Sequence, residues 1–201
     1  MTDVVALVDY GAGNLRSVEN ALREVGAAVV VTRDPDRVRA AARVVVPGQG
    51  SMPECAEAMR RSGVADALVE AIRGGKPVLG ICVGLQILFA DGEEAGGARG
   101  LGILPGTVRR LPDGVKLPHI GWSRVRTTPS CPPLLRPLDG QYLYFAHSYA
   151  APADARGAAL LCDHGRTYCA ALADGNLYGV QFHPEKSQKV GLALLDRFVK
   201  L

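Results

Sequence analysis

The order of apolar runs and helical segments in the first half of the chain limits the possible folds more than any other feature. Short apolar runs, rich in valine, predict buried strands at 4–8, 27–32, 44–46 and 78–81. Apolar residues recur at helical intervals in the segments 15–25, 52–61, 64–73 and 83–89. Because strands that alternate with helices form parallel sheets through right-handed crossovers, the sequence predicts an α/β fold.

The second half of the chain has a different pattern, in which short strand-like runs are joined by turns. These runs lie at 108–111, 122–125, 141–145, 158–162, 169–173 and 177–182. We expect them to be antiparallel additions to the sheet, with loops at 92–102 and 129–137. Asn14 and Ser187 are the predicted N-caps of the first and last helices. Since no repeat or linker interrupts the 201 residues, we expect one domain, residues 1–201.

Composition excludes several classes of function. The net charge is only +3, the basic residues are scattered and aromatic residues make up 5%, which disfavours a nucleic-acid surface. The run Val4–Val8 is too short for a signal peptide, and no stretch approaches the roughly 18 apolar residues of a membrane span. The cysteine count of five is odd and contains no CxxC pair. We therefore expect a cytoplasmic protein without metal, cofactor, nucleic acid or membrane partner.

The segment Gly80-Ile81-Cys82-Val83-Gly84 has the spacing of a nucleophile elbow between a strand and a helix. Such a turn is strained, and small residues two positions on either side of the nucleophile avoid clashes. It raises the nucleophile at the carboxyl end of the sheet, where ligands bind in open α/β folds. A helix start beneath Cys82 also favours the reactive thiolate. The alternative interpretation is a buried structural cysteine flanked by packing glycines.

His183-Pro184-Glu185 follows the strand-like run 177–182 and contains a candidate base with its orienting acceptor. Proline restricts the backbone between the two side chains, so the carboxylate can fold back onto one imidazole nitrogen. A surface His and Glu at a strand end is the alternative interpretation. His147 is a candidate buried imidazole, and His164 lies in a polar turn where we expect it to be solvated.

Pro47-Gly48-Gln49-Gly50 follows the third predicted strand, and its glycines allow backbone N–H groups to turn toward a substrate oxygen. The same pattern also describes a simple tight turn. No GK[ST] follows it, and Gly11-Ala12-Gly13 lacks the rest of a dinucleotide-binding fingerprint.

Together these residues resemble those of the class I glutamine amidotransferases. Gly80–Gln86 and 183–185 carry the triad pattern of that family. The resemblance is most specific to the glutaminase subunits of imidazole glycerol phosphate synthases, and it rests on five segments in order, at 9–18, 47–50, 116–122, 144–149 and 183–188. It implies a three-layer fold in which helices flank a mostly parallel sheet. Gln49 departs from the family, which usually has valine at this position.

The resemblance also implies a role for each matching residue. Cys82 would attack the carboxamide of L-glutamine, with His183 as base and Glu185 orienting it. Backbone amides of Gln49 and Val83 would stabilise the oxyanion. The residues that would hold the amino-acid end of glutamine are Gly50, Gln86, Ser148 and Tyr149.

The implied partner is a separate (β/α)8-barrel cyclase subunit, bound as a heterodimer. Ammonia would pass to it without escaping to solvent, to form imidazole glycerol phosphate and the aminoimidazole carboxamide ribotide AICAR in histidine biosynthesis. The residues that match its interface are Asn14, His119, Trp122 and Lys186. An exposed Trp beside basic residues also fits an interface anchor on physical grounds, although a core position is an equal alternative for Trp122.

Three other functions remain open at this point. A related amidotransferase, such as that for anthranilate or pyridoxal phosphate, would share the triad but not the segments 9–14 and 116–122. A silent scaffold subunit would have no reactive Cys82. A cysteine peptidase on a similar fold would cleave peptides without turning over glutamine.

Overall fold

The computed structural model describes residues 3–11 and 14–201, and a mixed eight-stranded sheet lies at its centre. In spatial order its strands are β2 (Ala28–Thr32), β1 (Val4–Val8), β3 (Arg43–Val46), β4 (Val78–Ile81), β14 (Leu177–Val180), β13 (Thr167–Asp174), β12 (Ala158–Asp163) and β9 (Arg126–Thr127). Neighbours from β2 to β14 pair in parallel, and those from β14 to β9 pair antiparallel. The predicted α/β fold with a mostly parallel sheet is confirmed.

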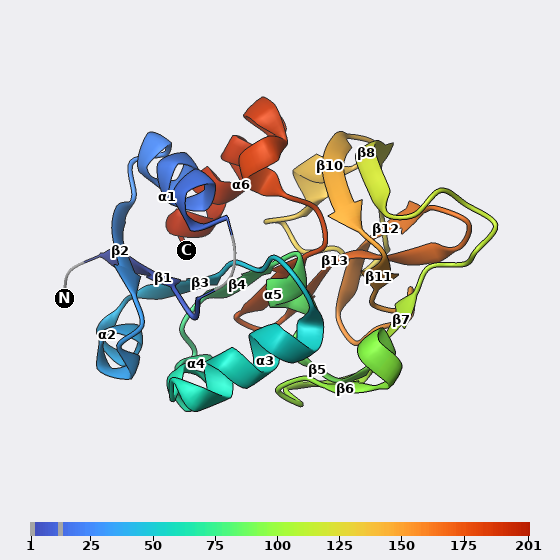
Figure 1. Cartoon of the computed structure of the whole chain (residues 1–201). Helices are drawn as coiled ribbons and strands as arrows, with labels where there is room; N and C mark the ends of the chain where they lie inside the picture. The colour runs from blue at the N-terminus through green and yellow to red at the C-terminus, as the bar shows by residue number, and fades with distance from the viewer. Residues whose placement is uncertain (1–2, 12–13) are drawn as a thin grey trace.

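Helices cover both faces of this sheet (Figure 1). One face carries α1 (Leu15–Glu24) and α6 (Gln188–Val199), and the other carries α2 (Pro35–Ala40), α3 (Met52–Arg61) and α4 (Val64–Arg73). Each helix turns an apolar stripe inward, such as Val18 and Leu22 of α1. Strands β3 and β4 are buried along their whole length, which explains their continuous apolar sequence. The molecule therefore has three layers.

The strands of the second half do not all join the main sheet as predicted. β8 (His119–Arg124) and β10 (Tyr142–His147) form a separate antiparallel ribbon. A four-stranded sheet contains β11 (Tyr149–Ala150), β7 (Leu104–Arg110), β5 (Phe89–Gly92) and β6 (Ala98–Arg99). β14 also pairs parallel to β4 rather than antiparallel. Alternation along a strand defines its buried face but does not identify the neighbour with which it pairs.

Two further predictions of local structure were wrong. The helix predicted at 83–89 stops early as α5 (Val83–Gln86), because Phe89 already begins β5. The loop predicted at 92–102 contains the 3-10 turn η1 (Glu94–Gly96) and the strand β6. The other 3-10 turns are η2 (Arg136–Leu138), at the end of the loop predicted at 129–137, and η3 (Pro184–Lys186), after His183.

Asn14 and Ser187 occupy N-cap positions but do not cap their helices with a side-chain hydrogen bond. The Asn14 side-chain oxygen instead accepts a hydrogen bond from the Ser17 hydroxyl, at 2.9 Å. The Ser187 hydroxyl donates to the carbonyl of His183, at 2.7 Å. Short polar side chains can bond to several nearby groups, and here the bonds to Ser17 and to the His183 carbonyl form instead of helix caps.

Among the described residues, no helix has the length and hydrophobicity needed to span a membrane.

Candidate active site

Cys82 lies in a strained turn between β4 and α5. Its φ of 54° and ψ of −112° are unusual for a residue with a side chain. The flanking glycines are required by close packing, because a Cβ on Gly80 would lie 2.6 Å from the Gly84 carbonyl oxygen. A Cβ on Gly84 would lie 2.0 Å from the carbonyl oxygen of Val46. The turn therefore has the backbone geometry of the predicted nucleophile elbow.

His183 follows the end of β14, and its Nδ1 lies 2.9 Å from Oε1 of Glu185. The Glu185 side chain is 1% exposed, so water hardly competes for this contact. Burial alone would lower the pKa of His183, but interactions with the Cys82 and Glu185 side chains outweigh it and raise the pKa to about 9. An imidazole with this pKa carries a proton at neutral pH. The structure thus brings Cys82, His183 and Glu185 together as one unit.

The His183 ring interacts with the Cys82 side chain. Because α5 is a single turn, spanning Val83–Gln86, its dipole is small, and the helix start contributes less than the sequence suggested. A neighbouring imidazolium favours the thiolate over the thiol, since it offers both charge and a hydrogen-bond donor. The pair is suited to nucleophilic attack on a carbonyl carbon.

The backbone of His183 is tied to strand β10. Its N–H donates to the carbonyl of Tyr144 at 2.9 Å. The fully buried Ser187 hydroxyl completes a second connection, because it donates to the His183 carbonyl at 2.7 Å and accepts from the Tyr144 N–H at 3.0 Å. These bonds fix the backbone of His183 and so limit where its imidazole can lie.

A cavity of about 220 Å³ opens beside the Cys82 side chain. The cavity has space for a small amino acid. Its lining consists of Gly50, Cys82, Val83, Gln86, Glu94, Pro118, Ala146, His147, Ser148 and Tyr149. All four residues proposed to bind the amino-acid end of glutamine are therefore brought to one cavity with the nucleophile. Gln49 lies next to Gly50 in the loop after β3, and its side chain is exposed.

Gln86 is buried in the wall of the cavity and donates hydrogen bonds to the Tyr149 carbonyl at 2.8 Å and to Oε1 of Gln181 at 3.0 Å. Gln181, which the sequence analysis missed, is completely buried, and its Nε2 lies 3.7 Å from Sγ of Cys82. The available signal was a polar residue inside an apolar run directly before His183. Glu94, also missed, lines the cavity and accepts a hydrogen bond from the Met52 N–H at 2.7 Å.

The remaining histidines form a cluster next to the cavity. His147 is buried, and its Nδ1 lies 2.9 Å from the Tyr149 carbonyl, as expected for a buried imidazole. Burial lowers the pKa of His147 to about 3 and that of His119 to about 4, so both rings are neutral at pH 7. His164 is half-buried and stacks on His119 with ring centroids 4.0 Å apart, rather than lying free in solvent. Among the described residues no group of His, Cys, Asp or Glu is arranged to hold a metal ion.

The residues predicted at the partner interface do not share one environment. Trp122 is 44% exposed and packs edge-on against Tyr144, with ring centroids 6.0 Å apart. The Lys186 ammonium lies 5.7 Å from the centre of the same Tyr144 ring, in cation–π contact. Asn14 is half-buried at the start of α1, next to residues 12 and 13, which lie outside the described residues.

His119 is the exception, because its side chain is 4% exposed and its Nε2 lies 2.8 Å from the Ser123 hydroxyl. Its ring also stacks on Phe145. The reason is register: His119 alternates with the outward-facing Ile120 along β8. His119 therefore supports the ribbon from inside and does not present its side chain at the surface.

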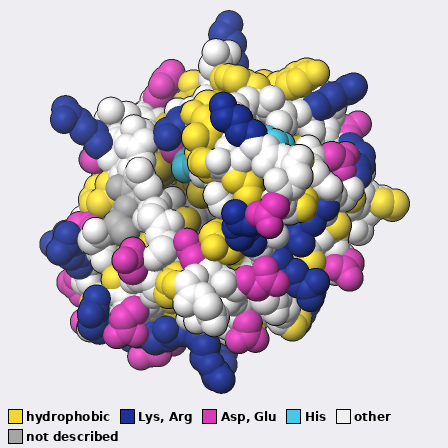
Figure 2. Space-filling view, turned by 45° about the vertical axis from the view of Figure 1, so that its right-hand side comes forward, with side chains coloured by type: hydrophobic (Ala, Val, Ile, Leu, Met, Phe, Trp, Pro, Cys, Tyr) yellow, Lys and Arg dark blue, Asp and Glu magenta, His cyan; other side chains and the backbone are white. Residues whose placement is uncertain are grey.

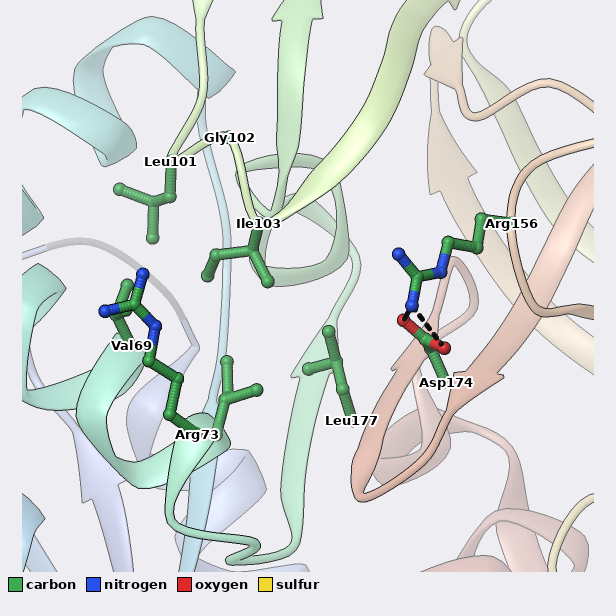
Figure 3. Close-up of a pocket in the computed structure, with 9 residues that line it drawn as sticks. Val69, Arg73, Leu101, Gly102, Ile103, Arg156, Asp174 and Leu177 are labelled. Atoms are coloured by element: carbon green, nitrogen blue, oxygen red, sulfur yellow. Dashed lines mark hydrogen bonds and ion pairs between the residues drawn. The ribbon is translucent and has the colours of Figure 1, made fainter.

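A larger cavity, of about 340 Å³, lies at the opposite ends of the strands (Figure 3). It is bordered by Arg73, before β4, and by Leu177, the first residue of β14, whereas Cys82 follows the end of β4. Figure 3 shows Arg156 paired with Asp174 at its rim, at 3.0 Å. Open parallel sheets bind substrates at the carboxyl ends of their strands, which favours the smaller cavity at Cys82 as the active site.

Charged side chains of both signs are scattered over the face shown in Figure 2. No continuous basic stripe crosses this face, in agreement with the small net charge of the sequence.

The family model described as "Glutamine amidotransferase class-I" matches residues 6–201. Proteins named imidazole glycerol phosphate synthase subunit HisH are similar over nearly the whole chain. The one from Nitrosomonas europaea is 46% identical, covering 98% of this chain and 97% of the relative. The one from Geobacter sulfurreducens is 41% identical, covering 96% of this chain and 97% of the relative.

Solved structures with lower sequence identity share the fold. A structure described as a glutamine amidotransferase has a TM-score of 0.76 at 18% identity and covers 98% of this chain and 99% of its own. The structure of PurLQS from Thermotoga maritima has a TM-score of 0.71 at 20% identity, with coverage of 100% and 96%.

Proposed function

Since the chain belongs to the class I glutamine amidotransferase family, we propose that it is the glutaminase subunit of an imidazole glycerol phosphate synthase. It hydrolyses L-glutamine to glutamate and ammonia, and a cyclase subunit uses the ammonia in histidine biosynthesis. The observation that carries the proposal is the Cys82–His183–Glu185 unit, whose Cys82 lines a cavity with space for an amino acid. The similarity to HisH subunits supports the choice among amidotransferases.

In the first step, the Cys82 thiolate attacks the carboxamide carbon of glutamine. The carbonyl oxygen becomes an oxyanion, which the backbone N–H groups of Gln49 and Val83 stabilise. Because the pKa of His183 is about 9, its ring already holds a proton at neutral pH. His183 donates this proton to the amide nitrogen, the carbon–nitrogen bond breaks, and ammonia leaves with a thioester on Cys82.

In the second step, neutral His183 takes a proton from water, and the resulting hydroxide attacks the thioester. The bond between carbon and sulfur breaks, glutamate leaves, and the thiolate–imidazolium pair is restored. Glu185 holds the Nδ1 proton of His183, so Nε2 faces the reacting atoms in both steps. Gly50, Gln86, Ser148 and Tyr149 orient the amino-acid end of the substrate in the cavity.

The surface of the β8–β10 ribbon is the proposed docking face for the cyclase. Ile120, Trp122 and Tyr142 are 63%, 44% and 59% exposed, which is unusual for large apolar side chains gathered on one ribbon. Tyr144 lies beside Trp122 on this face, and its backbone is bonded to that of His183. A cyclase of (β/α)8-barrel fold bound here, together with Asn14 and Lys186, would receive ammonia close to where it is released. We propose a heterodimer.

We also propose that residues 1–201 act as one glutamine amidotransferase domain and that the reaction takes place in the cytoplasm. The family match over residues 6–201 supports the first proposal. The buried cysteines of the chain, all of them free, support a reducing compartment.

Glutamate release, measured with and without the cyclase, tests the proposed function. The wild-type complex should release glutamate, whereas Cys82→Ala should release none and still bind the cyclase. Cys169→Ala is the matched control, because it removes another buried thiol from a strand outside the cavity. Glutamate release by Cys82→Ala, or peptide cleavage without glutamine turnover by the wild type, would refute the assignment.

A further inference from the structure

The loop Pro47–Gly50, which carries the proposed oxyanion donor Gln49, is pressed against the nucleophile elbow on one side. A Cβ on Gly48 would lie 2.1 Å from the Gly84 backbone nitrogen and 2.7 Å from Cβ of Val83. The loop and the elbow therefore touch backbone to backbone. Any shift of the loop changes the distance between the two proposed oxyanion donors, the N–H groups of Gln49 and Val83.

The other side of the loop is held by two buried side chains. Tyr10, directly after β1, donates from its hydroxyl to the Pro47 carbonyl, at 2.5 Å. Cys55, on α3, donates from its thiol to the Gln49 carbonyl, at 3.5 Å. Burial raises the pKa of both groups, so each keeps the proton that it donates. β1, β3, α3 and α5 approach one another in this part of the fold (Figure 1).

The two anchored carbonyls stand on either side of a single peptide. Pro47 contributes the carbonyl of the peptide before Gly48, and Gln49 contributes that of the peptide before Gly50. Between them lies the peptide that joins Gly48 to Gln49, whose N–H is the proposed donor. Gly50 has a φ of 97°, so glycine lets the chain turn sharply at the end of the anchored segment.

We propose that Tyr10 and Cys55 are positioning residues for the oxyanion hole: by fixing the carbonyls of Pro47 and Gln49, they set the orientation of the Gln49 N–H. This inference rests on the proposed glutaminase function and assigns a task to two residues outside the cavity. Neither lines the cavity beside Cys82. Cys55 is also a second cysteine close to the site whose role is structural, because its thiol is a protonated donor and not a nucleophile.

The expected signature is a loss of turnover without a loss of binding. Removing a whole oxyanion donor typically costs about 10²–10³-fold in kcat. Misaligning one donor should cost part of this, about 10-fold for Tyr10→Phe and for Cys55→Ala. The KM for glutamine should change less than about twofold if KM reflects ground-state binding. Cys55→Ser, which keeps a donor at this position, should retain more activity than Cys55→Ala.

The test uses the complex with the cyclase and measures kcat and KM for glutamine together with the rate at which iodoacetamide alkylates Cys82. Alkylation is a displacement at a saturated carbon and forms no oxyanion, so it reports on the thiolate alone. Tyr178→Phe and Cys169→Ala are matched controls, since Tyr178 packs on Phe198 and Cys169 donates to the Ala171 carbonyl, away from the loop. Thermal melting of each variant verifies that it is folded.

A fall in kcat with unchanged KM and unchanged alkylation, absent from both controls, supports the proposal. An unchanged kcat overturns it, and so does an equal fall in turnover and alkylation, because the effect then acts through Cys82. If the wild type and the controls release no glutamate, the proposed function itself has failed, which is a separate result.

Discussion

Raising the pH through the pKa of His183 is expected to lower the free energy of unfolding by an amount that follows from that pKa. The pKa of His183 is about 9 in the fold, against 6.5 for an unperturbed histidine. Each tenfold difference in proton affinity corresponds to about 1.4 kcal/mol. The protonated ring should therefore contribute about 3 kcal/mol to the free energy of unfolding, and its 5% exposure means that solvent screens this little.

The sign of this pH dependence follows from proton affinity, because the folded state binds the His183 proton more tightly than the unfolded chain does. The stabilisation is therefore complete below about pH 6.5, where both states are protonated. It declines as the unfolded chain loses its proton, and it is gone once the pH has passed the folded pKa of about 9. The contribution should thus disappear between about pH 6 and pH 10.

The assay is urea unfolding of the wild type and of His183→Asn at several pH values across this range. The titrating groups that do not contact His183 are shared by both proteins, so the difference between the two free energies reports on His183 together with its partners Cys82 and Glu185. The wild type should lose about 3 kcal/mol relative to the variant as the pH rises. A difference that is independent of pH, or that grows with pH, would show that the ring is not held protonated by Cys82 and Glu185.

Three further substitutions test other parts of the structure. Glu185→Gln should lower kcat by about 10³-fold or more without unfolding the chain, because an amide can hold the wrong imidazole tautomer. Steady-state glutamate release measures this, and a loss below tenfold would contradict the role of Glu185 in orienting His183. Trp122→Ala should weaken cyclase binding by about 2 kcal/mol, roughly 30-fold in Kd, and leave Tm unchanged. Calorimetric titration of the variant with the cyclase measures Kd, and an unchanged Kd would exclude Trp122 as an interface anchor. Gly84→Ala should lower the free energy of unfolding in urea by at least about 2 kcal/mol, because its Cβ would meet the Val46 carbonyl. Gly114→Ala is the control and should be neutral, because a Cβ there meets nothing within 4 Å. Equal stabilities of the two variants would contradict the packing argument.

Much of the fold was predictable because its signals are local. The strands at 4–8 and 78–81 and the helices at 52–61 and 64–73 have the predicted bounds. Each of these segments is either continuously apolar or has apolar residues at helical spacing, so a single strand or helix accounts for the burial of its apolar side chains. The nucleophile turn was predictable for the same reason, since its glycines and Cys82 are adjacent in sequence.

Pairing between distant segments was less predictable. The sequence indicated strands at 122–125 and 141–145, but their ribbon lies apart from the main sheet. Strand pairing depends on which edges the rest of the fold leaves open. His119 is a different case, because it lies three residues before Trp122 on the same strand and alternation along that strand turns it inward.

The sequence by itself determined the chemical groups available for catalysis and the backbone turn that presents Cys82, because bond geometry and residue size act over a few residues. Only the tertiary structure decided which groups meet. It buried Glu185 against His183, aimed Gln181 at the thiol, and placed Tyr10 and Cys55 behind the loop of Gln49. The contacts of Gln181 with Cys82 and of Tyr10 with Pro47 join segments far apart in the chain. The energies of all these contacts depend on burial and distance, which exist only once the layers have packed.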